Sequence, residues 1–170
     1  MTKKMGLGGI GLKLAVPSVM YFLIAGLLTL FFPKILQITS IPHWTLMRIG
    51  IILLAMGIPM LVISAATVSV SFRKGKLLTT GIYSRSRNPL YAAWILFIIP
   101  GLSLFFKSWP VLGTTLITYI SFKVFIKNEY LYLKETFGEE YLDYAARVNE
   151  LLPLPKLFRK KSTRIHHDPK

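Results

Sequence analysis

The sequence predicts an all-α membrane protein: a polytopic bundle of about four transmembrane helices, with C-terminal amphipathic helices at the cytoplasmic face. Hydrophobic residues make up 53% of the 170 residues and the mean hydropathy is +0.53, which is too apolar for one soluble domain of this size. Four long apolar runs follow one another along the chain. All seven acidic residues lie from Glu129 onward, so a cationic, apolar part precedes a mixed-charge, water-facing part.

The first transmembrane helix is predicted over residues 14–32, because about 20 apolar residues are needed to cross the hydrocarbon core. The basic leader before it, residues 1–13, resembles the start of a signal peptide. The apolar run is longer than that of a signal peptide, however, and no small-residue cleavage site follows it. Pro17 lies in the first turn, where proline costs little, and Pro33 is expected to end the helix.

The second helix is predicted over residues 49–70, which carry no charged side chain. Gly57 and Pro59 lie inside this run, and neighbouring helices are expected to cover the carbonyl that the proline leaves free. The connection before it contains His43 and Trp44. Tryptophan is typical of a membrane interface, and His43 has no nearby acidic or histidine partner, so we interpret it as interfacial and not as a ligand.

The third and fourth helices are predicted over residues 89–106 and 108–122. The connection between them is so short that the two helices should form a tight hairpin, and Pro100 is expected to bend the third. Lys123 follows in the last turn of the fourth helix. Its aliphatic stem can pass along apolar surface to place the ammonium in water, and a contact with a substrate carboxylate is the alternative.

Two amphipathic helices are predicted after Lys127, where aromatic and apolar residues recur at helical spacing with charges between them. Gly138 is expected to end the first helix, and Glu139 begins an acidic start to the second. Both are expected to lie against the cytoplasmic face. A single membrane domain is therefore predicted over residues 1–155, followed over residues 156–170 by a basic tail that is solvated or contacts lipid head groups.

The distribution of cations predicts the orientation in the membrane. The leader has three lysines, the connection between the second and third helices has five cations, and the chain from Lys127 onward has nine. The opposite connections carry only Lys34 and Arg48 on one and Lys107 on the other. The positive-inside rule therefore places both termini in the cytoplasm, at the cell membrane. The five-cation connection and the C-terminal helices then share one side.

That connection leads into the polar stretch GKLLTTGIYSRSRNPLY, residues 75–91. A basic, aromatic segment between two membrane helices is suited to hold a charged small molecule at the lipid boundary. Nucleic-acid binding is the weaker reading of the net charge of +14, because the apolar content favours membrane topology as its cause.

Several chemistries are excluded or unsupported. The chain has no cysteine, so no thiolate nucleophile or cysteine-ligated metal is possible. The motifs GxSxG, HExxH and the P-loop are absent from the sequence. The glycines of residues 6–11 follow no predicted strand, so we interpret them as a flexible leader and not as a dinucleotide-binding motif. The adjacent pair His166 and His167 has no third ligand and makes a poor metal site. A site that binds well but has few acid–base groups suits a reaction with a pre-activated cofactor.

Three motifs and one glutamate occur in a fixed order: TTGIY at residues 79–83 and RNPLY at 87–91, then Glu129, then FGEEYLDYAARVNELLP at 137–153. This arrangement, with a hairpin between, resembles the isoprenylcysteine carboxyl methyltransferase family. More broadly it resembles the integral-membrane methyltransferases that include bacterial phospholipid methyltransferases. The resemblance covers about residues 75–153 and implies a methyltransferase that uses S-adenosylmethionine (SAM).

The resemblance also implies the site residues. Arg87, Asn88 and Glu129 are the catalytic candidates. Ten positions are implied to bind SAM: Gly75, Lys76, Leu77, Leu78, Tyr83, Asn88, Pro89, Leu90, Tyr91 and Glu129. Their chemistry agrees, because Glu129 can accept hydrogen bonds from ribose hydroxyls or an ammonium and Arg87 can pair with the SAM carboxylate. The tyrosine rings can pack on adenine or face the sulfonium.

Structural readings of the same residues stay open. Glu129 can be a helix-surface charge paired with Lys127 or Lys123. Arg85 and Arg87 can serve membrane topology and contact lipid head groups.

The sequence departs from the family pattern in ways that bear on the substrate. Asn88 stands where the eukaryotic enzymes have histidine, Tyr130 replaces the second glutamate of a Glu-Glu pair, and Ala92 and Ala93 stand where glycine is common. The expected acceptor is a lipophilic small molecule or lipid from the bilayer. A carboxylate acceptor is favoured, because it needs no general base, whereas an amine would leave Glu129 as the only helper.

Two other functions remain open at this stage. Membrane sterol reductases, which use NADPH, look similar around the RNPLY segment, but this chain is shorter and lacks their tryptophan-rich loop. A non-enzymatic membrane scaffold that binds anionic lipid is the second alternative, and the tyrosine at position 130 leaves room for it.

Overall fold

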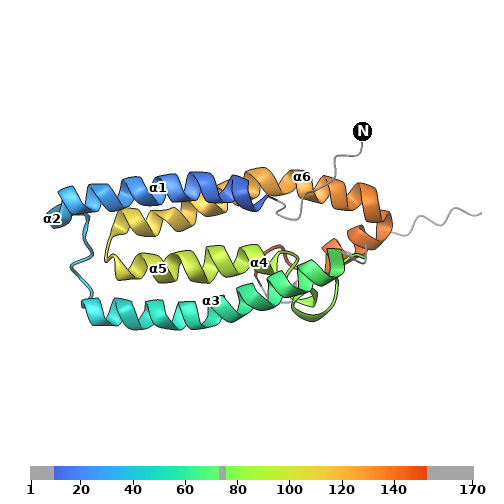
Figure 1. The fold of residues 1–170 in the computed structure, drawn as a ribbon, viewed down its shortest axis with the longest axis horizontal. Coiled ribbons are helices and arrows are strands. Elements are labelled where there is room, and N and C mark those ends of the chain that lie inside the picture. The colour runs from blue at the N-terminus through green and yellow to red at the C-terminus, as the bar shows by residue number, and fades with distance from the viewer. Residues whose placement is uncertain (1–9, 73–75, 153–170) are drawn as a thin grey trace, which may run out of the picture.

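The computed structural model of the protein describes residues 10–72 and 76–152, and every regular element in these ranges is helical. Figure 1 shows an elongated bundle in which the long helices run side by side. In chain order the elements are α1 (Gly11–Phe31), α2 (Pro33–Leu36), α3 (His43–Phe72), the 3₁₀ turn η1 (Gly81–Ser84), α4 (Pro89–Ala92), the π-helical segment η2 (Ala93–Ile98), α5 (Ile99–Phe105) and α6 (Trp109–Arg147). The all-α prediction is confirmed.

Three of these helices, α1, α3 and α6, are long and apolar enough to cross a membrane. The third predicted span is a shorter apolar stretch, Pro89–Phe105, which comprises α4, η2 and α5. The apolar side chains of α1 and α3 are largely exposed, as Leu23, Ile52 and Val62 illustrate. Such surfaces fit a lipid environment, because apolar side chains that face hydrocarbon need no cover from protein.

The fourth predicted span does not end near Lys123. It is the first part of α6, which stays helical from Trp109 to Phe137, a length of roughly 44 Å at 1.5 Å per residue. The expected separate helix after Lys127 is therefore the second half of the same helix, because neither proline nor glycine interrupts the chain between Lys123 and Phe137. At Gly138 the backbone leaves the helical region (φ 51°, ψ −127°), and the predicted break there is confirmed.

The predicted hairpin between α5 and α6 is confirmed. Lys107 takes a positive φ of 50°, and Ser108 then caps α6 by accepting a hydrogen bond from the backbone N–H of Val111 at 3.3 Å. Before the hairpin, Pro100 cannot donate to the preceding turn, and the π-helical segment η2 lies just ahead of it. The irregularity expected from Pro100 thus takes the form of a π-helical stretch.

Close backbone approach holds α3 against α5 and η2. A Cβ atom on Gly50 would lie 2.8 Å from the carbonyl oxygen of Gly101, and one on Gly57 would lie 2.7 Å from Phe97. Only glycine permits these distances, which resembles the small-residue packing common between membrane helices. On the other side of the bundle, α6 packs along α1, where the Thr118 hydroxyl donates to Ser18 at 2.8 Å.

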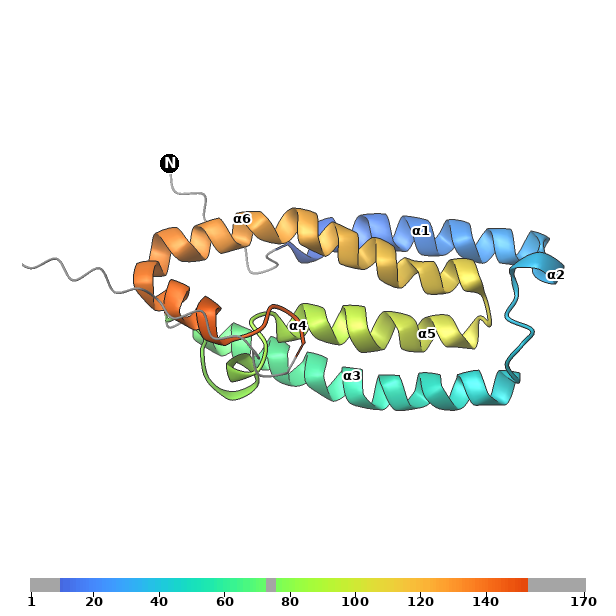
Figure 2. The same cartoon turned by 180° about the vertical axis from the view of Figure 1, so that it is seen from behind.

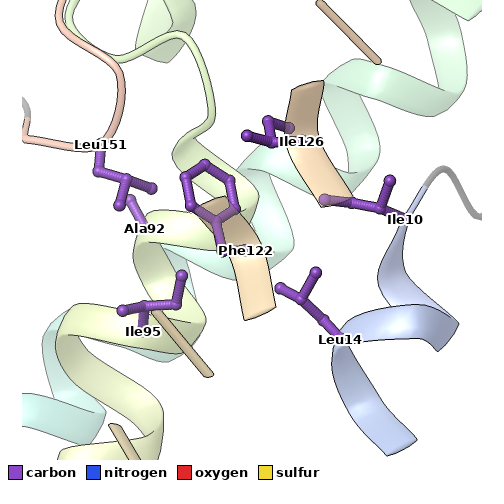
Figure 3. Packing of buried hydrophobic residues seen from close by; sticks show 7 residues of the cluster. All are labelled: Ile10, Leu14, Ala92, Ile95, Phe122, Ile126 and Leu151. Atoms are coloured by element: carbon purple, nitrogen blue, oxygen red, sulfur yellow. The ribbon is translucent and has the colours of Figure 1, made fainter. Parts of the chain in front are cut away.

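The largest buried cluster joins the start of α1, the α4–η2 region, the middle of α6 and the C-terminal segment. Figure 3 shows the Phe122 ring among the aliphatic side chains of this cluster. Phe122 and Ala92 are completely buried, and Leu151 is 7% exposed. Tyr91 and Tyr130 pack against the cluster from its edge, so the apolar core directly supports the polar residues described next.

Candidate functional site

The C-terminal segment returns from the bend in α6 and pairs with the loop that precedes α4. The backbone N–H of Arg87 donates to the carbonyl of Asn149 at 2.8 Å, and that of Asn88 donates to the carbonyl of Glu150 at 3.1 Å. Ser86 and Asn149 form an isolated parallel bridge. Figure 2 shows the loop and the C-terminal segment together at one end of the bundle, beside the end of α3. The two regions that the sequence placed on one side of the membrane are therefore in direct contact.

Asn88 lies at the centre of this junction and is only 6% exposed. Its side-chain amide nitrogen donates to the Tyr130 hydroxyl and to the main-chain carbonyl of Glu150, the latter at 3.1 Å. Both amide hydrogens are thereby used, because an amide nitrogen carries two. Asn88 thus connects the loop, α6 and the C-terminal segment.

Glu129, which directly precedes Tyr130 on α6, faces α4. The Tyr91 hydroxyl donates to its Oε2 at 3.3 Å, and both residues are half-buried. Lys123 pairs instead with Glu150, with its Nζ 2.6 Å from Oε2. The alternative in which Glu129 is a surface charge paired with Lys123 is therefore not what the structure shows.

Arg87 lies beside two tyrosines of α6. Its guanidinium carbon is 4.9 Å from the centroid of the Tyr130 ring, a cation–π contact. The Arg87 Nε and the Tyr141 hydroxyl are both buried without a hydrogen-bond partner among residues 10–72 and 76–152. The Arg87 guanidinium acts electrostatically on the Tyr141 phenol, so these two buried polar groups face each other between the loop and α6.

Tyr83 closes the site from the loop side. It is 7% exposed, and its carbonyl accepts a hydrogen bond from the Tyr144 hydroxyl at 2.7 Å. Burial raises the pKa of the Tyr83 phenol well above its usual value, and the nearby Tyr144 and Glu129 raise this pKa further. Tyr83 is therefore a neutral phenol at physiological pH and lies within electrostatic reach of Glu129.

Most of the predicted site residues meet at this end of the bundle. Asn88 and Pro89 are buried, and Arg87, Leu90, Tyr91 and Glu129 are half-buried. Leu77 packs against the cluster of Tyr141, Tyr144 and Val148. Leu78 is half-buried, Lys76 is exposed, and Gly75 lies outside the described residues.

Sequence reasoning missed Glu150 and Tyr141, and it treated Tyr130 only as a departure from a pattern. The structure puts all three at the junction. The approach of Glu150 to α6 depends on a return of the chain after Gly138 that no local motif reveals.

Fold and site together define a class: a small all-α membrane protein with a polar, cation-containing site at one end of its helices. A sequence model of the phospholipid methyltransferase family matches residues 41–140, more than half of the chain. The chain therefore belongs to this family, whose members are SAM-dependent methyltransferases. The expectations of a membrane methyltransferase and of SAM as methyl donor are confirmed.

Curated relatives agree. The chain is 24% identical over 133 residues to a probable protein-S-isoprenylcysteine O-methyltransferase of Oryza sativa subsp. indica, which covers 73% of this chain and 67% of that protein. It is 25% identical over 132 residues to protein-S-isoprenylcysteine O-methyltransferase B of Arabidopsis thaliana, covering 72% and 64%. A Xenopus laevis protein-S-isoprenylcysteine O-methyltransferase is 35% identical over 80 residues, covering 47% and 28%. No solved structure matches the chain.

Proposed function

We propose that the protein methylates a lipophilic acceptor, a carboxylate or a lipid head group, at the cytoplasmic face of the membrane. The observation that carries this proposal is that Arg87 and Asn88 contact Tyr130, the residue next to Glu129 on α6. The loop and α6 together bring a half-buried cation, a buried amide and a half-buried carboxylate to one end of the bundle beside the apolar core.

The residues present fit SAM, which carries a carboxylate, an ammonium, ribose hydroxyls and a sulfonium. Arg87 offers a buried Nε–H without a partner among the described residues, and this donor suits the carboxylate. Glu129 suits the ammonium or the ribose hydroxyls, and the Tyr91 hydroxyl holds its carboxylate. The remaining contacts are proposed for Gly75, Lys76, Leu77, Leu78, Tyr83, Pro89 and Leu90.

When bound, SAM supplies an activated methyl group whose bond to sulfur breaks with both electrons left on the sulfur. For a carboxylate acceptor the new oxygen–carbon bond releases no proton, so the chain needs only to position the reactants and exclude water. For an amine acceptor one proton must be removed, and Glu129 is the carboxylate placed to take it. The scarcity of other acid–base groups favours the carboxylate.

Access from two sides supports this assignment. The exposed apolar surfaces of α1 and α3 suit contact with lipid, so a lipophilic acceptor enters sideways from the bilayer while SAM enters from water. We place both termini, the loop before α4 and the C-terminal part of α6 in the cytoplasm, with Pro89–Phe105 as a fourth, short span.

The proposal is tested with purified protein in lipid nanodiscs and SAM labelled at the methyl group. Label is expected to pass into lipid extracted from the host membrane, and the Glu129→Gln variant is expected to lose most of this transfer. Glu135→Gln serves as the control, because it removes an exposed carboxylate of the same helix. Alkaline hydrolysis separates the acceptors: a methyl ester releases volatile labelled methanol, whereas an N-methyl label stays on the non-volatile head-group fragment. Binding of SAM without transfer to any lipid would contradict the proposal, as would preference for NADPH.

A further inference from the structure

The Glu150 carboxylate occupies a position that the proposed methyl transfer leaves unexplained. Its Oε2 lies 2.6 Å from the Nζ of Lys123, and its Oε1 accepts a hydrogen bond from the Tyr130 hydroxyl at 3.1 Å. The Glu150 side chain is 23% exposed. A carboxylate that is mostly shielded from water costs free energy unless its oxygens are partnered, and here both oxygens are.

The donors and acceptors in this chain of hydrogen bonds have a fixed direction. The Asn88 amide nitrogen can only donate, so the Tyr130 hydroxyl must accept from it. The tyrosine then gives its own hydrogen to Glu150, because a carboxylate only accepts. Glu150 therefore determines the direction of the Tyr130 O–H bond. As a result, a lone pair of the Tyr130 oxygen stays directed toward Asn88.

The main chain of Glu150 acts on the same amide. Its carbonyl oxygen accepts from the Asn88 side chain at 3.1 Å and also from the Asn88 backbone N–H at 3.1 Å. Rotating the amide by half a turn would bring its oxygen against this carbonyl oxygen and against Tyr130. The orientation of Asn88 is thus set from two sides by one residue, and the Tyr130 ring also carries the Arg87 guanidinium.

We propose that Glu150 is a positioning residue of the methyltransferase site, which holds Tyr130 and, through it, Asn88 and Arg87 in the arrangement that binds SAM. This inference rests on the function proposed above for Asn88 and Arg87. It also gives position 130 a physical account. The family pattern has a glutamate there, and this chain brings a carboxylate to the Tyr130 hydroxyl from residue 150, which lies beyond the family match at 41–140.

The test measures the dissociation constant of SAM by calorimetry, together with the KM for SAM and kcat, in nanodiscs. Glu150→Ala is expected to raise the dissociation constant and KM about tenfold, as loss of a hydrogen bond to a charged group does, with kcat within about twofold. A merely structural role would instead reduce the active fraction, which lowers apparent kcat and leaves KM unchanged. Glu150→Gln keeps an acceptor for Tyr130 and is expected to lose only about threefold.

Tyr130→Phe gives a second, milder variant that keeps the ring and its contact with Arg87. It is expected to match Glu150→Ala, and the double variant is expected to be no weaker than either single one, because both remove the same chain of contacts. Additive losses would overturn the inference. An unchanged dissociation constant for SAM in both single variants would overturn the inference as well. In that case the wild-type protein would still bind SAM, and the proposed function would not be contradicted.

Two controls separate the parts of the network. Glu135→Gln removes an exposed carboxylate of α6 and is expected to change neither constant. Lys123→Met breaks the ion pair and leaves the Tyr130–Glu150 bond, so it should cost no more than about threefold. If Lys123→Met costs as much as Glu150→Ala, the ion pair carries the effect and the inference is wrong. If the wild-type protein binds no SAM, the proposed function itself is contradicted.

Discussion

The hydroxyl of Tyr91, on α4, lies 3.3 Å from the carboxylate of Glu129, on α6. These two residues belong to helices that are joined by the hairpin at Lys107, and the contact closes the open end of that hairpin. Because the Tyr91 ring also packs against Phe122 at 5.5 Å between centroids, the apolar core fixes the distance between the loop side and the carboxylate side of the site.

Two substitutions that remove this contact should weaken SAM binding to different extents. Tyr91→Phe keeps the ring and is expected to raise the dissociation constant of SAM a few-fold, since it removes one hydrogen bond to a carboxylate that keeps its charge. Glu129→Gln removes the charge itself and is expected to raise it about tenfold or more. Calorimetry on both variants checks the order. A larger loss from Tyr91→Phe than from Glu129→Gln would contradict the assigned roles.

Arg87 and Arg85 provide a matched pair of substitutions. Arg87 is half-buried over Tyr130, whereas Arg85 is exposed. Arg87→Ala is expected to raise the KM for SAM at least tenfold, because it removes a shielded charge partner of the cofactor carboxylate. Arg85→Ala should change KM less than twofold. Equal effects of the two changes would favour general attraction of an anionic ligand over a specific contact.

The bend at Gly138 should be essential for the site although it lies outside it. Its φ of 51° and ψ of −127° form a conformation that residues with a Cβ rarely adopt. Gly138→Ala is therefore expected to lower the free energy of unfolding by about 1–3 kcal/mol. It should also weaken SAM binding, because the C-terminal segment loses its hydrogen bonds with Asn88.

Gly26→Ala is the control for this change. A Cβ on either Gly26 or Gly138 would meet nothing within 4 Å, so only the backbone conformation distinguishes the two positions. Thermal unfolding in detergent and calorimetry with SAM give the comparison. If both alanine variants behave like the wild type, the bend is not what positions the C-terminal segment.

The apolar cluster beneath the site should carry much of the stability at this end. Phe122 is completely buried within it, and Phe122→Ala is expected to cost about 3–5 kcal/mol, since the cavity adds to the lost burial. Val124→Ala, on the exposed face of the same helix, should cost under about 1 kcal/mol. Chemical or thermal unfolding in detergent measures both. A similar cost for the two substitutions would show that this cluster does not support the bundle.

Local patterns predicted much of the fold. The long apolar runs, the hairpin at Lys107 and the break at Gly138 each follow from the residues at those positions, and the structure confirms them. The continuity of α6 through Lys127 was missed, because a change from apolar to amphipathic composition was interpreted as a boundary. Composition reports the surroundings of a helix, whereas its end requires a residue that stops it.

The part of the site that comes from short sequence motifs could be predicted. Asn88 and Tyr91 come from one motif, and Glu129 is the first carboxylate of the chain. Glu150 was out of reach, because its role depends on the reversal of the chain at Gly138 and on pairing with Arg87 and Asn88. Such long-range pairing leaves no periodic signal in the sequence. The proposed orientation of the termini stays a prediction, and so do the roles expected of the residues before residue 10 and after residue 152.

The central claim is that the loop before α4 and the second half of α6 contact the same SAM molecule. Photochemical cross-linking of methyl-labelled SAM to protein in nanodiscs, followed by peptide mapping, tests it directly. Label is expected in the peptides that contain Tyr83–Tyr91 and Glu129, and excess unlabelled SAM should abolish it. Label confined to one of these regions, or found mainly elsewhere in the chain, would contradict the account.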